Sequence, residues 1–282
     1  MKIAIVIPAY NEEHFIGQTL QSLVEQSVQA SQILVVDDNS TDGTAKIIQQ
    51  FQEQHGNIRY VKNKSEQVHL PGSKVVQAFN FGLNTLTVDY EILCKFDADL
   101  IFPPNYLEHL VAIFKSDPQV GMAGGFCHIL KDEKWILENL TNKDHIRGAL
   151  KAYRKSCFEQ MNGLKPAMGW DTLDELLAQY HGWNIQTDQS LMVKHLKPTG
   201  KTYSAKAKFK QGEAFYGMHY GLALTIIASG KLALRKKSLT YFINCMCGYL
   251  LAKKLKKPFL VNEKEGRFIR QLRWATIKKK LF

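Results

Sequence analysis

The chain has 282 residues, of which 45% are hydrophobic and 22% are charged, a globular composition that excludes a disordered or fibrous protein. This length can bury a substantial core, as one large α/β domain or as one domain with an appendage. The five cysteines are odd in number and none has the paired spacing of a zinc site, which indicates a reduced, intracellular protein. A strand-like run at residues 2–8 leaves no room for a signal peptide, so we expect a cytoplasmic location.

The formal net charge of +11 is distributed unevenly along the chain. Residues 1–200 hold 18 Lys/Arg and 23 Asp/Glu, whereas residues 201–282 hold 19 and 3. Such asymmetry predicts an anionic partner for the C-terminal part: a membrane leaflet, nucleic acid, or an acidic or phosphorylated acceptor. We therefore expect an enzyme body at 1–200 and a basic attachment or acceptor region at 201–282.

Short apolar runs alternate with amphipathic stretches in the first part of the chain. Strands are expected at residues 3–8, 33–36, 58–61, 90–96 and 120–130. Helices are expected between them at residues 13–26, 41–54, 74–86 and 105–114. This alternation predicts a largely parallel sheet with helices on both faces, where ligands bind beyond the carboxyl ends of the strands.

Helical patterns dominate the later part of the chain. One helix is expected from Asp171 to His181, where Gly182 ends it. Two apolar stretches follow at residues 221–234 and 239–252. Both are shorter than the roughly 20 residues that cross a bilayer, so we expect core helices or helices lying in a membrane interface.

Acidic side chains follow three of the expected strands. Glu12 follows the first, Asp37 and Asp38 the second, and Asp97 and Asp99 the fourth. Because the ends of parallel strands share one edge of a sheet, these acids predict a single cleft. Two carboxylates separated by one residue can bind one Mg²⁺ or Mn²⁺, which prefer oxygen ligands and leave positions for phosphates. The alternative is a loop of solvated acids.

The adjacent pair Asp37 and Asp38 allows two interpretations. One carboxylate can accept the imide N–H of a uracil, or the equivalent edge of another base. Alternatively, the Asp-Asn-Ser-Thr-Asp-Gly run at residues 38–43 serves only as a turn and helix cap.

Taken together, these motifs resemble the family 2 glycosyltransferases of GT-A fold, a Rossmann-like α/β fold. The matching segments are residues 7–13, 35–44, 72–82 and 96–99, in the expected order. The resemblance covers roughly residues 2–200. It implies that the nucleotide base and ribose pocket is lined by Pro8, Tyr10, Glu12 and Asp38. It also implies that Lys74 and Asp97 lie near the donor, and that Asp99, with Asp97, holds Mn²⁺ or Mg²⁺ on the diphosphate.

The resemblance also identifies candidates for the catalytic base and a third metal ligand. In the relatives, the base is the Asp of a Glu-Asp pair at a helix start, about eleven residues before a glycine. Asp171 has that position, and Trp170 replaces the Glu, where an indole could stack on a sugar ring. Asp174, one turn later, is the rival base, and acids that merely favour a helix N-terminus are the alternative. His195 resembles the histidine that completes the metal shell.

These candidates imply an inverting transfer of a sugar from a UDP- or GDP-sugar to a hydroxyl of a glycan or lipid-linked acceptor, in cell-surface polysaccharide or glycoconjugate synthesis. His219 is expected at an acceptor or product contact, or in packing. The alternatives are a GT-A-fold nucleotidyltransferase and a non-catalytic protein that binds a nucleotide-sugar or a membrane surface. A haloacid-dehalogenase-like phosphatase is disfavoured, because Ile101 stands where that class has Thr or Val.

Basic clusters flank the two late apolar stretches. They lie at residues 231–237, 253–257 and 278–280. This pattern predicts peripheral binding to an anionic membrane surface at the inner face of the membrane, with a solvated basic face as the alternative. Nucleic acid is not an expected partner, because no recognised motif accompanies the charge. The oligomeric state is left open.

Overall fold

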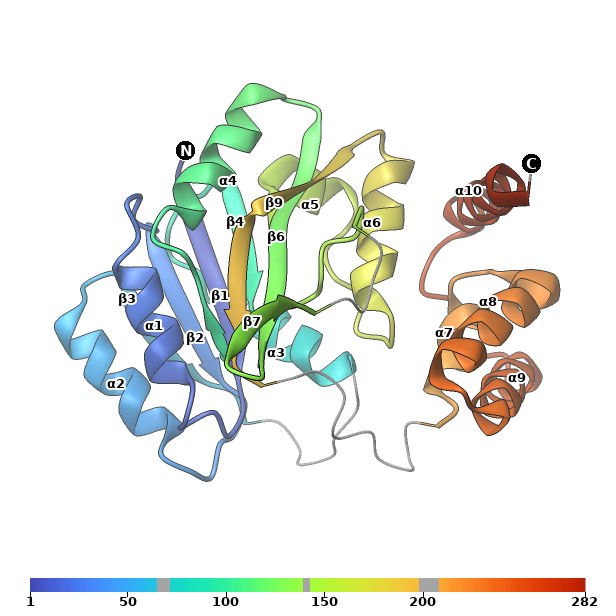
Figure 1. Ribbon diagram of the computed structural model, residues 1–282, viewed down its shortest axis with the longest axis horizontal. Coiled ribbons are helices and arrows are strands. Elements are labelled where there is room, and N and C mark those ends of the chain that lie inside the picture. The colour runs from blue at the N-terminus through green and yellow to red at the C-terminus, as the bar shows by residue number, and fades with distance from the viewer. Residues whose placement is uncertain (65–71, 139–142, 198–207, 282) are drawn as a thin grey trace.

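The computed structural model describes residues 1–64, 72–138, 143–197 and 208–281 (Figure 1). The strands are β1 (Ile3–Ala9), β2 (Gln32–Asp37), β3 (Ile58–Lys62), β4 (Ile92–Phe96), β5 (Leu100–Ile101), β6 (Val120–Lys131), β7 (Lys134–Leu137), β8 (Leu150–Arg154) and β9 (Asn184–His195). The helices are α1 (Ile16–Val24), α2 (Thr44–Gln54), α3 (Ser73–Leu83), α4 (Tyr106–Ser116), α5 (Lys155–Gln160), α6 (Trp170–Tyr180), α7 (Lys210–Gly217), α8 (Gly221–Lys236), α9 (Leu239–Lys254) and α10 (Glu263–Leu281).

The nine strands of the described residues form one sheet in the order β3-β2-β1-β4-β8-β6-β9-β5, with β7 paired to β6. The strands β1 to β4 run parallel, and helices lie on both faces of the sheet (Figure 1). Their apolar runs are nearly continuous because both faces are covered, and every residue of β2 is buried. The predicted α/β fold with a mostly parallel sheet is confirmed.

The centre of the sheet contains a strand that the apolar pattern did not predict. Strand β8 runs antiparallel to both β4 and β6. Its sequence is Leu-Lys-Ala-Tyr-Arg, and four of these five residues are buried. The strand was not predicted because its two basic residues interrupt the apolar pattern. The short β5 pairs antiparallel with β9, and Leu100 faces His195 in that register. This pairing brings the turn after β4 to the end of β9.

The C-terminal helices α7 to α10 lie to one side of the sheet, beyond α6 (Figure 1). Helix α10 contacts α6, and the rings of Tyr180 and Phe268 meet at a centroid distance of 5.5 Å. Helices α8 and α9 occupy the two predicted apolar stretches, and α7 and α10 were not predicted as separate helices. Among the described residues, none of the helices combines the length and the hydropathy that a bilayer crossing requires. The expected boundary near residue 200 lies outside the described residues.

Two glycines allow α7 and α9 to cross at very short range. A Cβ atom on Gly212 would lie 1.8 Å from the Cys245 carbonyl oxygen, and one on Gly248 would lie 2.1 Å from the Phe209 carbonyl oxygen. Backbone atoms cannot move aside as a flexible side chain can. The packing of α7 on α9 therefore depends on the absence of side chains at these two positions.

The substitution Gly212→Ala should lower the free energy of unfolding by about 1–3 kcal/mol, because the new methyl group overpacks the α7–α9 contact. The control is Gly230→Ala in α8, where a Cβ would meet nothing within 4 Å. That change should raise stability by about 0.5–1 kcal/mol through helix propensity. Thermal unfolding of both variants tests the pair, and equal effects would contradict the close crossing.

Candidate active site

The polar turns that follow β1 and β2 are tied to each other. The backbone N–H of Asn11 donates to Ser40 Oγ (3.0 Å), and that of Thr41 donates to Asn11 Oδ1 (2.9 Å). The N–H of Glu12 donates to Thr44 Oγ1 at the start of α2 (2.8 Å). Asn11 itself has a positive φ of 53°, which Asn tolerates better than most residues. These bonds fix both turns at the carboxyl edge of the sheet.

The two aspartates after β2 have different environments. Asp37 is fully buried and accepts bonds from the Ser40 N–H (2.8 Å) and the Tyr60 hydroxyl (3.0 Å). Burial and the bond to Asp37 raise the pKa of Tyr60 to about 12. Asp38 accepts a bond from the Asn63 side chain (2.8 Å). Asp37 therefore stabilises the turn with both carboxylate oxygens, which leaves Asp38 as the candidate for a base contact.

Lys74 and Tyr10 lie close together at the carboxyl edge of the sheet. The Lys74 Nζ lies 5.9 Å from the centroid of the half-exposed Tyr10 ring. Just before Lys74, Ser73 Oγ donates to the Pro166 carbonyl (3.1 Å). Gly72 has a φ of +75°, and a Cβ there would lie 2.8 Å from the Ala167 carbonyl oxygen. The start of α3 is thus packed closely against the loop that precedes α6.

Asp99 and His195 lie together, with one carboxylate oxygen unpaired. The His195 Nε2 is 3.4 Å from Asp99 Oδ2, and its Nδ1 is 2.9 Å from Glu138 Oε2. Burial lowers the pKa of His195, but the hydrogen bonds to Asp99 and Glu138 outweigh it and raise the pKa to about 9. The Asp99 Oδ1 is buried and has no hydrogen-bond partner among the described residues. A buried carboxylate oxygen without a partner is costly, so this atom is suited to a cation.

Glu12 adds a third carboxylate to the same region. Its Oε1 accepts from Lys197 Nζ at 2.9 Å, whereas Oε2 is buried without a partner in the described chain. Burial, opposed by the bond to Lys197, raises the pKa of Glu12, and the negative charges of Asp99 and Asp97 raise it further. A divalent cation would relieve this repulsion. The oxygen-rich set with one imidazole fits Mn²⁺ or Mg²⁺.

His195 also belongs to a second group of side chains that could bind a metal ion. Cys127, Glu138 and His195 each place one ligand atom within 4.8 Å of the others. Burial raises the pKa of the Cys127 thiol to about 12, and Arg147 forms an ion pair with Glu138. A protonated thiol and a paired carboxylate are poor ligands for a hard cation. We therefore assign Glu138 to the orientation of the imidazole, an arrangement common behind metal-binding histidines.

Two buried lysines connect the Asp97 turn with α6. Lys95 and Lys151 face each other in the β4–β8 register and are almost fully buried. The Lys95 ammonium pairs with Asp97 Oδ1 and donates to the Gly148 carbonyl (2.9 Å). The two ammonium groups lie 5.2 and 5.9 Å from the centroid of the Trp170 ring.

Trp170 does not form the stacking wall that the sequence suggested. Its side chain is only 6% exposed, and a Cβ on Gly148 would lie 2.7 Å from its ring. The indole instead packs inward and offers its π face to the two lysines, a favourable contact for desolvated ammonium groups. The interpretation of Trp170 as a surface for a sugar ring is therefore wrong.

Asp171 is the second residue of α6 and remains partly accessible, with 34% of its side chain exposed. Its Oδ2 lies 3.7 Å from His145 Nε2, and His145 Nδ1 is 2.9 Å from Glu175 Oε2. Burial opposes ionisation, but the bond to His145 and the charge of Lys151 lower the pKa of Asp171 to about 2. Burial likewise lowers the pKa of His145, and the bonds to Asp171 and Glu175 outweigh it and raise that pKa to about 9. Asp171 is therefore an ionised carboxylate at neutral pH.

Asp174 is buried, and other side chains bind its carboxylate. It is 2% exposed and accepts from Lys151 Nζ (2.8 Å) and from the Tyr153 hydroxyl (2.7 Å). Both carboxylate oxygens are thus engaged. Burial raises the pKa of Asp174, and the positive charge of Lys151 opposes that rise. This geometry favours Asp171 over Asp174 as the group that can reach an acceptor.

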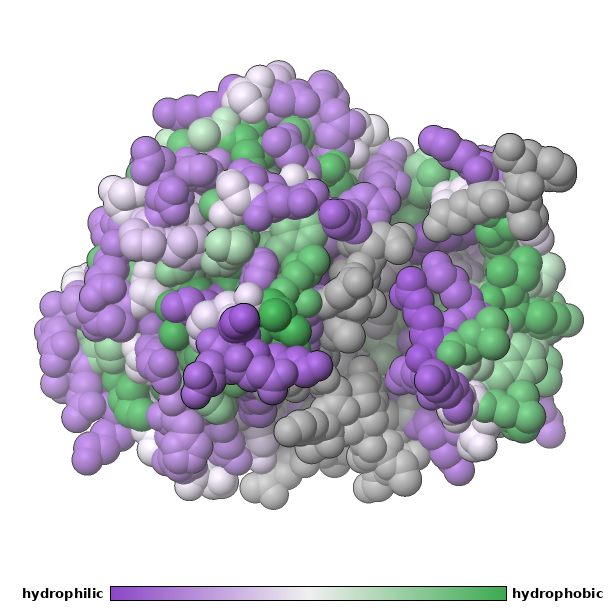
Figure 2. All heavy atoms as spheres, viewed as in Figure 1, coloured by the Kyte–Doolittle hydropathy of each residue, from purple (hydrophilic) through white to green (hydrophobic). Residues whose placement is uncertain are grey.

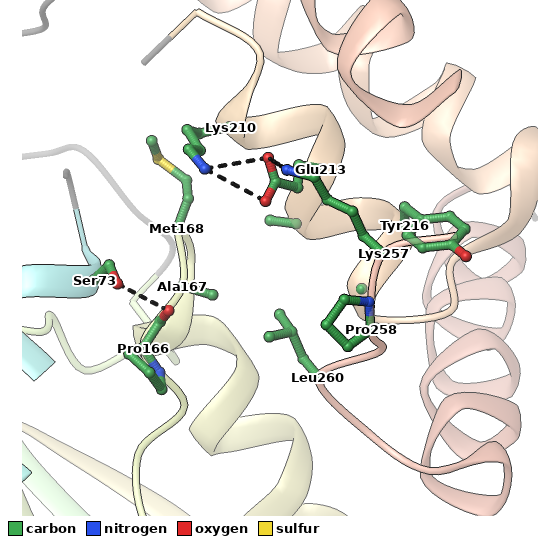
Figure 3. A pocket seen from close by; sticks show the side chains of 12 residues that line it. Ser73, Pro166, Ala167, Met168, Lys210, Glu213, Tyr216, Lys257, Pro258 and Leu260 are labelled. Carbon is green, nitrogen blue, oxygen red and sulfur yellow. Dashed lines mark hydrogen bonds and ion pairs between the residues drawn. The ribbon is translucent and has the colours of Figure 1, made fainter. Parts of the chain in front are cut away.

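His219 lies in packing contacts beyond α7. Its ring stacks on Phe259 at a centroid distance of 3.6 Å, and a Cβ on Gly266 would lie 2.5 Å from its Cβ. Near it, a cavity of about 170 Å³ separates the Pro166–Met168 loop from α7 and the segment around Leu260 (Figure 3). Lys210, Glu213 and Lys257 form ion pairs at its rim. Of the two interpretations of His219, the structure supports packing.

Sequence reasoning missed the supporting residues of this site. They are Lys95, Glu138, His145, Arg147, Lys151 and Tyr153. The only available signal was a lysine within each of two apolar stretches, Lys95 and Lys151. A charged residue inside an otherwise apolar strand indicates a buried ion pair or a functional site.

Residues 4–162, more than half of the chain, match the family model described as "Glycosyl transferase family 2". With the sheet topology and the strand-end acids, this match defines the class of the chain: a family 2 protein with a GT-A-type fold. The chain belongs to glycosyl transferase family 2.

Three similar proteins illustrate the comparison. The undecaprenyl-phosphate 4-deoxy-4-formamido-L-arabinose transferase of Proteus mirabilis is 31% identical over 116 residues, 39% of this chain and 33% of that protein. S. aureus TarS 1-349 with UDP-GlcNAc has a TM-score of 0.57 at 17% identity, covering 83% of this chain and 67% of that one. Mannosyltransferase PcManGT from Pyrobaculum calidifontis with GDP-Man and Mn²⁺ has a TM-score of 0.57 at 15% identity, covering 98% and 80%. The chain spans about a third of the length of the curated relatives it matches.

The raised pKa of His145 predicts a pH-dependent stability. Because the imidazolium is stabilised in the folded state, its contribution is complete below pH 6.5 and is lost as the pH rises through about 9. The substitution His145→Gln should cost about 2 kcal/mol at pH 6 and much less at pH 10. Urea unfolding at both pH values measures this. The exposed His14→Gln is the control, and a pH-independent cost at His145 would contradict the ion pair.

Proposed function

We propose that this glycosyltransferase moves a sugar from a UDP- or GDP-sugar to a hydroxyl of a glycan or lipid-linked acceptor, with inversion at the anomeric carbon. The observation that carries the proposal is the buried Asp99 Oδ1 beside His195, which has no hydrogen-bond partner in the part of the chain that the structure describes, on the same sheet edge as Glu12 and Asp97. Such a constellation suits a cation and a diphosphate. Similar proteins include TarS in complex with UDP-GlcNAc, PcManGT in complex with GDP-Man and Mn²⁺, and an undecaprenyl-phosphate transferase.

The donor half of the site comprises the fixed turns after β1 and β2 and the start of α3. We assign the base and ribose pocket to Pro8, Tyr10, Glu12 and Asp38. Lys74, which already approaches the Tyr10 ring, lies at the donor's phosphate or sugar. Asp38 is the base contact because Asp37 uses both oxygens inside the fold.

The metal position comprises Asp99, His195 and Asp97. Asp99 Oδ1 has no partner within the described ranges, and the imidazole of His195 is held in place by Glu138. Asp97 is partly neutralised by Lys95, so its carboxylate contributes less negative charge than that of Asp99. A bound Mn²⁺ or Mg²⁺ would offset the negative charge that develops on the departing nucleoside diphosphate.

The acceptor half of the site is the start of α6. In the proposed reaction the Asp171 carboxylate takes the proton of the acceptor hydroxyl while that oxygen attacks the anomeric carbon. His145 holds the carboxylate in place from one side, and its bond, with the charge of Lys151, lowers the pKa of Asp171. Asp174 neutralises Lys151 and does not meet the acceptor. Synthesis of a cell-surface polysaccharide or glycoconjugate is the proposed role of the product.

The substitution Asp171→Asn should lower the rate of transfer by 10²–10⁴, because the amide cannot take the proton. Donor affinity should change little, since Asp171 lies on the acceptor side. The measurement combines turnover with a thermal-shift titration of UDP- and GDP-sugars in the presence of Mn²⁺. Asp144→Asn, at a neighbouring exposed acid, is the control.

Two outcomes of this experiment would contradict the proposal. Undiminished turnover by Asp171→Asn would remove Asp171 from the reaction. Pyrophosphate release from a nucleoside triphosphate and a sugar 1-phosphate, without transfer to any hydroxyl, would identify a nucleotidyltransferase. Metal-dependent hydrolysis of a nucleotide-sugar by the wild type separates an enzyme from a binding protein.

The metal assignment predicts an effect at Glu138, which contacts no substrate in the proposal. The substitution Glu138→Gln should weaken Mn²⁺ binding about 10–100-fold, because the imidazole of His195 loses its carboxylate partner. Calorimetric titration of Mn²⁺ into the free enzyme measures this without any turnover. Glu133→Gln, on the exposed β6–β7 turn, should leave the affinity unchanged. Equal affinities of all three proteins would contradict the assignment.

A further inference from the structure

The outer face of α8 and α9 carries most of the large apolar side chains that the C-terminal region exposes. The two helices form a hairpin joined by Lys237 and Ser238. Their exposed apolar residues are Leu222, Ile226, Ile227 and Leu234 on α8, and Leu239, Ile243, Leu250 and Leu251 on α9. Leu234 and Leu239 are 80% and 75% exposed. Figure 2 shows apolar side chains gathered over these helices, on the side remote from the sheet.

The inner face of the hairpin has mostly small residues. Besides Leu224 and Tyr249, the buried positions are Thr225, Ser229 and Ala233 on α8 and Cys245, Gly248 and Ala252 on α9. A helix on a water-soluble protein normally buries its large apolar residues and exposes polar ones. Helices α8 and α9 instead expose eight large apolar side chains and bury only two, Leu224 and Tyr249. An exposed apolar surface of this extent indicates an interaction site.

The charge around this face has one sign. No acidic residue occurs between Glu213 and Glu263, a segment that contains both helices. Exposed basic residues lie at both ends of the hairpin: Arg235, Lys236 and Lys237 at the turn, and Lys253, Lys254 and Lys256 at the end of α9. Long basic side chains can extend from the rim of an apolar face toward anionic headgroups.

We propose that the outer face of the α8–α9 hairpin binds an anionic lipid bilayer, with both helices lying in the interface. Large apolar residues with cations at the rim and no acids match an interfacial helix pair. A second copy of the same face is a poor partner, because two cationic rims would repel each other. The described helices are not able to cross the bilayer, so the contact is peripheral.

The hairpin is connected to the acceptor side of the site. Helix α7 packs on α9, and α7 also borders the cavity next to the Pro166–Met168 loop, which leads into Asp171 (Figure 3). A bilayer on α8 and α9 would therefore hold the acceptor side near lipid headgroups. This consequence rests on the proposed function and favours a lipid-linked acceptor, whereas the surface itself does not depend on the transferase chemistry.

Co-sedimentation of the full chain with vesicles tests the surface. Binding to phosphatidylglycerol–phosphatidylcholine vesicles at low salt is expected to exceed binding to pure phosphatidylcholine and to fall at high salt. The variant Arg235→Gln/Lys253→Gln/Lys254→Gln should bind about 100-fold more weakly, from about 1 kcal/mol per basic residue. A matched variant, Lys46→Gln/Lys115→Gln/Lys131→Gln, removes three exposed lysines of the enzyme body and should bind like the wild type.

A second variant tests the apolar face separately from charge. Leu234→Gln/Leu239→Gln/Ile243→Gln changes three exposed side chains of this face, so it should keep the thermal midpoint and lose vesicle binding by tenfold or more. Unchanged vesicle binding by both variants would overturn the proposal. The proposal would also be overturned if sedimentation velocity showed that the wild type forms a dimer without lipid and that this variant does not, because the face would then bind a second copy of the chain. Metal-dependent hydrolysis of the donor is measured in parallel on the same proteins without lipid. This measurement shows whether the proposed transferase chemistry fails independently of membrane binding.

Discussion

The burial of two lysines in the centre of the sheet is the constraint on which the site depends. Lys95 and Lys151 face each other across β4 and β8, where both ammonium groups are removed from water. A buried charge is tolerated only when it is paired and hydrogen-bonded. Asp97 pairs with Lys95, Asp174 and Glu175 pair with Lys151, and the Trp170 ring lies near both. The turn after β4 and the start of α6 are thereby held together.

This constraint explains why neighbouring acids of similar appearance have different roles. Asp174 and Glu175 neutralise a buried cation, whereas Asp171, one turn earlier, keeps an accessible carboxylate at the helix start. The positive charge of Lys151 also lowers the pKa of Asp171, which keeps that carboxylate ionised. Lys151 therefore holds the helix in place and, together with the larger effect of the His145 bond, lowers the pKa of the proposed base.

The other half of the site depends on strand pairing. The antiparallel register of β5 with β9 brings His195 to the turn that carries Asp99, and Glu138 reaches His195 from the end of β7. The bond from Lys197 to Glu12 connects the end of β9 with the turn after β1. Residues separated by up to 185 positions in the chain thus surround one place at the sheet edge.

The sequence by itself determined the first four strands, the helices between them and the acids at their carboxyl ends, because local periodicity reports burial and parallel strands end at one edge. It also determined the family, the apolar stretches of α8 and α9 and the basic C-terminal region. Only the tertiary structure decided that Asp37 serves the fold, that Trp170 is buried, and that Lys95, Glu138, His145 and Lys151 support the site. These contacts depend on strand register and burial between segments far apart in the chain, which no local pattern encodes.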